Sequence, residues 1–308
     1  MHLRAGVTSL ALLVATPAHA DDVIPGHAID RPVTGAVIGL ALGGLAAASL
    51  FPMREAPELW QRQLWCVDKH AHDNLSPRAA ALADGLLAAS IAAPVLYLTG
   101  SSIEDADGDR LLVYGEMMAI NAGLAQLAKM VVQRPRPYLY GTSAAARAYA
   151  RTQGDDAWRS FYSGHAALSF GAAVAGAYLL GASTDSAGAE RAAWAAGLGV
   201  AAATANLRVR AGKHHLSDVV IGGLIGATVG YVVPALHADD APYTPSGVDA
   251  LAALAGIAGG LMLSQLVPLD RDAEQSAPAT GLRAALARGQ LSPVPLAGGL
   301  GVSFAGAL

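Results

Sequence analysis

The stretch RVRAGKHHLSD, residues 208–218, joins two long apolar runs of the chain. The run before it covers residues 191–207 and the run after it residues 218–236, and both are rich in alanine and glycine, which lets helices approach closely. His214 precedes Asp218 by four residues at the mouth of the second run. Its ring can donate one N–H to the carboxylate and keep the other nitrogen free to attack. We therefore predict a nucleophilic histidine between two packed helices.

Other apolar runs of helical length lie on both sides of this stretch. They cover residues 33–53, 79–98, 111–132, 164–183 and 248–267. The first of them has no charged residue and is just long enough to span a bilayer. The expected fold is all-α: a membrane-embedded bundle of about six to seven helices.

The two ends of the chain differ from this helical part. Residues 1–20 have a basic start, a short apolar core and small residues before Asp21, so we expect a secretory signal cleaved after Ala20, with an uncleaved anchor as the alternative. The helical domain would then cover residues 21–269. In the tail, residues 270–308, apolar residues alternate with small ones beyond a turn at Gly298-Gly299, which suggests a short β-hairpin.

The composition excludes several classes of site. The chain of 308 residues is 53% hydrophobic and 14% charged, with a net charge of −4, so no bulk attraction to nucleic acid is expected. Cys66 is the single cysteine, which rules out an intrachain disulfide and a thiolate metal cluster. The histidines show no HExxH pattern for zinc.

Two earlier stretches add positive charge and a second histidine. KMVVQRPRP, residues 129–137, ends one helical run, and SFYSGH, residues 160–165, opens another. Lysine and arginine bind anionic oxygens, and a helix N-terminus adds partial positive charge. The three stretches together predict an anion site that holds two histidines.

The order and spacing of these residues resemble the three-part signature of the type 2 phosphatidic acid phosphatase superfamily, which includes vanadium haloperoxidases. The resemblance covers residues 115–234. It departs from the usual pattern at Tyr162, where proline is common, and at Leu207, where serine is common and a hydroxyl donor is therefore missing.

The resemblance assigns a role to each of these side chains. His214 would be the nucleophile that forms a phosphohistidine, Asp218 would hold its tautomer, and His165 would be first the acid and then the base on water. The phosphate would be held by Lys129, Arg136, Ser163, Gly164 and Arg208. No metal or other cofactor is expected, because the cations take the place of a magnesium ion.

Several polar residues favour structural roles. Arg134 reads as a rim charge, His215 as part of the pocket wall, and Glu116 as a buried polar contact that could bias the pKa of a neighbour. Arg210 and Lys213 read as charges that flank a membrane, and Trp60 and Trp65 as interfacial anchors. Residues 133–159 read as a long functional loop.

The leading hypothesis is a metal-independent phosphatase acting on a lipid phosphate or pyrophosphate, with membrane lipids around it. The alternatives are a vanadium haloperoxidase and a non-catalytic membrane protein that binds lipid phosphate. We expect a bacterial-type inner membrane with the pocket facing the periplasm. A soluble periplasmic bundle is the alternative, since counting crossings from residue 33 would place the pocket in the cytoplasm.

Overall fold

The computed structural model describes residues 29–49, 66–105, 108–238, 241–268, 290–296 and 299–305. The expected signal peptide, Trp60, Trp65 and most of the tail lie outside these residues. Within them, the expected all-α membrane fold is confirmed. The α-helices are α1 (Arg31–Ser49), α2 (Pro77–Asp105), α3 (Asp109–Val132), α4 (Ala144–Ala150), α5 (Gly164–Gly181), α6 (Ala187–Arg210), α7 (Leu216–Leu236) and α8 (Gly247–Gln265).

The long connection after α3 is more ordered than the sequence suggested. It contains α4 and two short 3-10 helices, η3 (Pro137–Tyr140) and η4 (Gly154–Trp158), and a third, η2 (Cys66–Ala71), precedes α2. Ser143 caps α4, since its hydroxyl accepts a hydrogen bond from the backbone N–H of Ala146 at 3.1 Å. The expected loop of residues 133–159 is therefore a folded segment.

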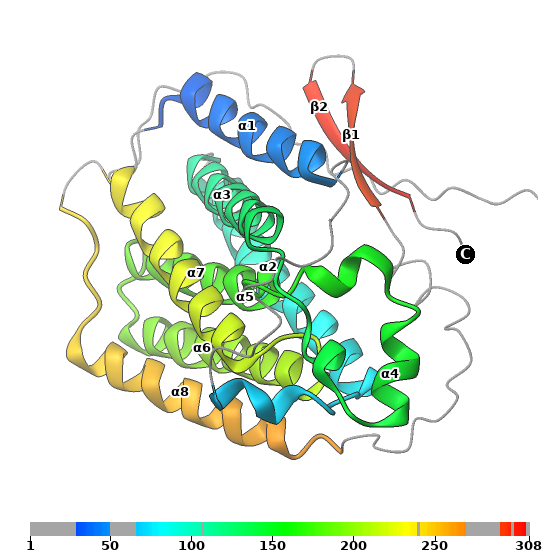
Figure 1. Ribbon diagram of the computed structural model, residues 1–308. Coiled ribbons are helices and arrows are strands. Elements are labelled where there is room, and N and C mark those ends of the chain that lie inside the picture. Colours follow the sequence, from blue (N-terminus) through cyan, green and yellow to red (C-terminus); the bar gives the residue numbers. More distant parts are fainter. Residues whose placement is uncertain are drawn as a thin grey trace, which may run out of the picture. The chain divides into compact units, whose positions relative to one another are not determined.

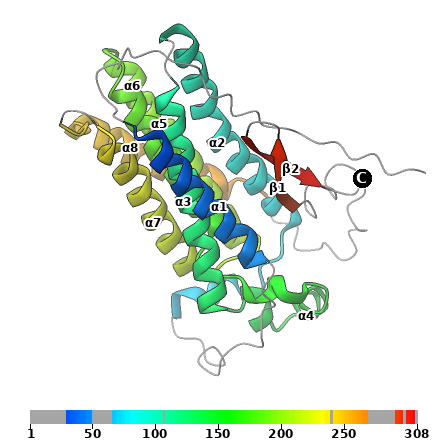
Figure 2. The same ribbon diagram turned by 90° about the horizontal axis from the view of Figure 1, so that it is seen from above.

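The long helices pack side by side (Figures 1 and 2): α5 lies against α6 and α7, α8 lies along α6, and α1 lies along α3. Small residues permit these contacts. A Cβ atom on Gly226 of α7 would stand 2.1 Å from the carbonyl oxygen of Ala167 in α5, and one on Gly256 of α8 would stand 2.0 Å from that of Ala195 in α6. Glycine is required there because the backbones themselves touch.

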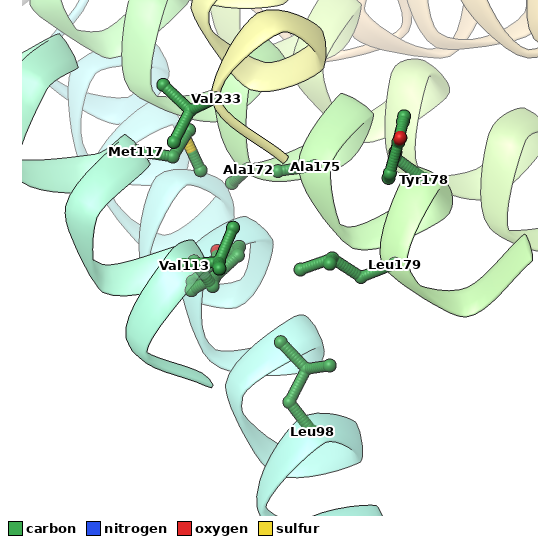
Figure 3. Packing of buried hydrophobic residues seen from close by; sticks show 9 residues of the cluster. Leu98, Val113, Met117, Ala172, Ala175, Tyr178, Leu179 and Val233 are labelled. Atoms are coloured by element: carbon green, nitrogen blue, oxygen red, sulfur yellow. The ribbon is translucent and has the colours of Figure 1, made fainter. Parts of the chain in front are cut away.

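The largest core cluster joins four helices. Figure 3 shows Leu98 of α2, Val113 and Met117 of α3, Tyr178 and Leu179 of α5, and Val233 of α7 gathered around Ala172 and Ala175. Alanines at the centre keep the helix axes close while the larger side chains fill the space around them. This core fixes α3, α5 and α7, which carry much of the site described below.

Several helices suit a bilayer by length and composition. Those long and apolar enough to cross one cover residues Pro77–Gly100, Asp109–Tyr140, Gly164–Gly181, Leu216–Leu236 and Gly247–Gln265, whereas the apolar part of α1 is shorter. Leu224 of α7 and Leu251 and Leu254 of α8 are exposed on the helix surfaces. An apolar outer surface is what a lipid environment requires, so the chain has the character of a membrane protein.

The tail contains the expected hairpin as a separate unit. β1 (Gln290–Leu296) pairs antiparallel with β2 (Gly299–Ala305), and Leu296 stands opposite Gly299. Gly299, expected in the turn, therefore belongs to the second strand, and Gly298 lies outside the described residues.

Candidate active site

His214 is buried in the connection between α6 and α7, and one nitrogen of its ring makes a hydrogen bond to the backbone. Its Nδ1 lies 2.8 Å from the carbonyl oxygen of Ser160. A carbonyl only accepts, so Nδ1 carries the proton and Nε2 keeps a lone pair. Asp218 was expected to make this bond, but its Oδ2 lies 3.8 Å from Nδ1. The backbone of Ser160 therefore orients the imidazole, and Asp218 acts on it by charge.

The electrostatics of this pocket keep His214 neutral. Burial lowers the pKa of His214 well below its usual 6.5, and the charges of Arg136 and Arg208 lower it further, against the opposing effect of Asp218. A neutral imidazole with a free Nε2 is the nucleophilic form. The charge of Arg208 also acts on His165, so both histidines lie within the field of one cation.

Asp218 is fully buried and joins the start of α7 to the SFYSGH stretch. Its Oδ2 accepts hydrogen bonds from the Ser160 hydroxyl at 2.5 Å and from the His215 backbone at 2.9 Å, and its backbone carbonyl accepts from the Ser163 N–H at 3.1 Å. The SFYSGH stretch is therefore joined to the start of α7 by side chain and main chain together.

Arg134 is not a rim charge, contrary to the expectation. It is buried and lies between two buried carboxylates, with Nη1 2.6 Å from Asp218 and Nη2 2.7 Å from Asp68 of η2. Asp68 also accepts from the backbone and hydroxyl of Ser217, at 3.0 and 2.7 Å. Burial favours a protonated Asp68, but the bonds from Ser217 and Arg134 outweigh it and lower its pKa. Arg134 therefore neutralises a pair of buried carboxylates.

Most of the N–H groups of Arg136 already donate to protein acceptors, so fewer are available to an anion than in an unpaired guanidinium. Its Nε donates to the Asp156 carbonyl at 2.8 Å, its Nη2 to the Asp156 carboxylate at 2.7 Å, and its Nη1 to the Lys213 carbonyl at 2.8 Å. Three of its five N–H groups are used, and two remain for an anion. Arg136 and Lys213 hold the pKa of Asp156 at about 2, although burial opposes this.

Lys129 lies beside the glycine of the second stretch. Its Nζ would stand 3.4 Å from a Cβ atom on Gly164, and among the described residues it makes no hydrogen bond to a protein acceptor. The charges of Arg136 and Arg208 both act on it. The three expected cations therefore share one electrostatic environment.

His165 and Arg208 meet at a carboxylate that the sequence did not assign to the site. Asp84 of α2 places its Oδ1 2.7 Å from His165 Nε2 and 3.0 Å from Arg208 Nη1. Arg208 is buried, and its Nε has no hydrogen-bond partner among the described residues. A buried guanidinium with an unused donor is suited to a further anion.

Ser163 is fully buried and caps α5. Its hydroxyl oxygen accepts a hydrogen bond from the Ala166 N–H at 3.4 Å, which leaves the hydroxyl proton available for donation. The N-terminus of α5 therefore lies at Gly164 and His165, and its partial positive charge adds to that of Lys129 beside Gly164.

Three other polar residues have structural contacts of their own. His215 places Nε2 3.1 Å from the Pro135 carbonyl and stacks edge-on with Tyr140, as a wall residue would. Arg210 donates to the carbonyls of Ser264 and Val267, so it caps the end of α8. Glu116 lies 3.0 Å from His237, as a buried polar contact.

Lys213 differs from the membrane-flanking role expected of it. It is half-buried, contacts the hydroxyl of Tyr149, and lies 4.9 Å from that ring's centroid. Burial lowers the pKa of Lys213 to about 8, with Arg136 and Arg208 acting in the same direction. It is therefore a fourth cation of the site.

Both departures from the family pattern lie in packed surroundings. Leu207 is buried against Ala79, Ala83 and Ala211, so this position faces α2. Tyr162 packs with Ala125 and Ala167 between α3 and α5, and burial raises its pKa to about 12.

A model of a known protein family matches part of the chain. The family model described as PAP2 superfamily matches residues 110–241, a stretch that contains all three motifs. Residues 110–241 are thus similar to the PAP2 superfamily. Neither the curated proteins nor the solved structures contain a match to it. PAP2 proteins are typically phosphatases, and the family also includes haloperoxidase-like members. Asp68 and Asp84 lie before the PAP2 segment and reach into its site.

The described part of the chain offers no group of three or more His, Cys, Asp or Glu side chains arranged to hold a metal ion. The carboxylates Asp68, Asp156 and Asp218 instead pair with arginine.

Proposed function

We propose that this chain is a lipid phosphate phosphatase that works through a phosphohistidine on His214. The observation that carries the proposal is the ring of His214: Nδ1 is committed to the Ser160 carbonyl, so Nε2 is left unprotonated within the field of Arg136 and Arg208. A neutral nucleophile surrounded by cations suits attack on a phosphate, whose negative charge the cations stabilise.

The reaction has two steps. In the first, His214 Nε2 forms a bond to phosphorus while the ester P–O bond breaks, and His165 gives a proton to the departing alkoxide. In the second, His165 takes a proton from water, the water oxygen bonds to phosphorus, and the N–P bond breaks. Lys129, Arg136 and Arg208 hold the phosphoryl oxygens throughout.

A lipid substrate follows from where the site lies in the helices. Lys129 is in the last turn of α3, His165 in the first turn of α5, and His214 just before α7. The site is thus at one end of helices that are long enough to cross a bilayer, which is the depth of lipid headgroups. A phosphate there would be presented by the membrane itself.

The test is phosphate release in detergent micelles that contain phosphatidic acid. Wild type should release phosphate and His214→Ala should not, while the exposed His70→Ala is the matched control and should keep full activity. Rapid acid-free quenching should trap labelled phosphate on the protein in wild type but not in His214→Ala. Turnover by His214→Ala at the wild-type rate would refute the mechanism, and phosphate binding without release by wild type would refute the enzyme.

The proposed orientation has its own experiment. We propose an inner-membrane protein with its site facing the periplasm. A single cysteine at the exposed position Arg147 of α4, in a chain with Cys66→Ser, should react with a membrane-impermeant maleimide in intact cells. Reaction only after the cells are opened would place the site in the cytoplasm.

A further inference from the structure

Asp84 is an unusual residue for its place in the fold. Between Ala79 and Gly100 it is the sole charged residue of an apolar helix long enough to cross a membrane. It lies seven residues into α2, about 10 Å from the helix start. A charge at such a position is costly and is usually retained for a function.

The contacts of Asp84 are with groups that the proposed function assigns to substrate. Its Oδ1 accepts from His165 Nε2 at 2.7 Å and from Arg208 Nη1 at 3.0 Å. His165 needs its ring proton for the leaving oxygen, and Arg208 needs its N–H groups for phosphoryl oxygens. The Asp84 carboxylate therefore holds donors that a bound phosphate would use.

The carboxylate also repels what the site binds. A phosphate monoester near neutral pH carries close to two negative charges, and like charges within about 4–6 Å disfavour each other. Arg208 is buried, whereas the Asp84 side chain is 61% exposed. The exposed partner is free to turn toward solvent while the arginine stays in place.

We propose that Asp84 is a positioning residue that competes with phosphate for Arg208. It keeps His165 and Arg208 aligned between turnovers, and it yields Arg208 when substrate binds. When the ester bond is broken, it reclaims Arg208 and helps inorganic phosphate to leave. The residue therefore weakens anion binding and speeds product release. This inference rests on the proposed function, because it assigns Arg208 to a phosphate.

The variant Asp84→Asn separates this role from a structural one. Asparagine keeps the oxygen that accepts from His165 and Arg208 but loses the charge. The purified variant should bind inorganic phosphate about tenfold more tightly than wild type by titration calorimetry, since one like charge within reach is removed. Its KM and kcat toward phosphatidic acid should both fall, as substrate binds better and phosphate leaves more slowly. A merely structural aspartate would not produce tighter binding.

The matched control is Asp185→Asn, an exposed acid after the far end of α5, which removes the same charge and should leave phosphate affinity unchanged. Equal or weaker phosphate binding by Asp84→Asn would overturn the proposal. Failure of both Asp84→Asn and Asp84→Ala to fold would also overturn it, because the proposal requires contacts that the protein can release. If wild type binds phosphate but hydrolyses no ester, the proposed function fails, and the binding comparison still decides the role of Asp84.

Discussion

Arg134 offers the sharpest test of the structure. A buried ion pair and a surface charge, the two roles considered for this residue, differ greatly in the stability lost when the arginine is replaced. Replacement by methionine keeps much of the side-chain volume and removes the charge between Asp68 and Asp218. Both carboxylates are fully buried. Breaking a buried pair by removing one partner costs about 3–5 kcal/mol, whereas a surface ion pair contributes about 0–1 kcal/mol.

This difference is large enough to see in a melting curve. One kcal/mol shifts the melting temperature by roughly 2–4 °C in a chain of 150–250 residues. Arg134→Met should therefore lower the apparent melting temperature in detergent by about 6–20 °C. The matched control is Arg147→Met in α4, which removes an exposed arginine and should shift the melting temperature by no more than about 4 °C.

A second variant identifies the cause. If the loss comes from uncompensated acids, adding Asp68→Asn to Arg134→Met should recover part of the stability, because one buried charge is removed. A melting temperature for Arg134→Met within about 2 °C of the Arg147→Met control would refute the buried pair. So would a double variant that is less stable than Arg134→Met alone.

Three other predictions follow from the helix contacts and the charges of the site. Gly226→Ala should destabilise the protein by about 1–3 kcal/mol in thermal unfolding, because its Cβ would stand 2.1 Å from a carbonyl oxygen of α5, whereas Gly44→Ala meets nothing within 4 Å and should not. Because the pKa of His214 is lowered, its imidazole stays neutral as the pH falls below 6.5, so the acid limb of the pH profile of kcat/KM should not have its midpoint at or above 6.5. A wild-type midpoint in that range, shifted by substitutions of residues next to His214, would contradict this. Lys213 has a pKa of about 8, so it is charged below that pH and neutral above it, and kcat/KM of the wild type toward a dianionic ester should decline through pH 8. Lys213→Arg should keep its activity to higher pH, because arginine stays charged. The same decline in both proteins would exclude Lys213 as its source.

The helices were predictable because long apolar runs with few charged residues leave few other folds. Residues 111–132 and 218–236 match α3 and α7 to within two residues at each end, since polar residues or proline border them. The spacing of the three motifs also indicated which segments carry the cations. The folded connection around α4 was missed because short helices leave little periodicity to detect.

Asp68 and Asp84 could not be found in the same way. Asp84 meets His165 across 81 sequence positions and Asp68 meets Ser217 across 149, and no local pattern encodes such pairs. Arg134 and Arg136 stand two residues apart in similar surroundings, yet one neutralises buried acids and the other faces Asp156. Only the packing of η2 and η4 separates their roles. The one available signal was Asp84 itself, a lone charge in an apolar helix.

The position of Asp68 and Asp84 ahead of residue 110 has a practical consequence for anyone who shortens or recombines this protein. A fragment cut at the limits of the shared segment would retain every signature residue and still lose one of the two counter-ions of Arg134 and the carboxylate partner of His165. Two chains with identical signature residues can then differ in how tightly they bind an anion, because the acidic residues that precede the signature differ. Grafts between relatives should accordingly carry the first hundred residues along with the signature.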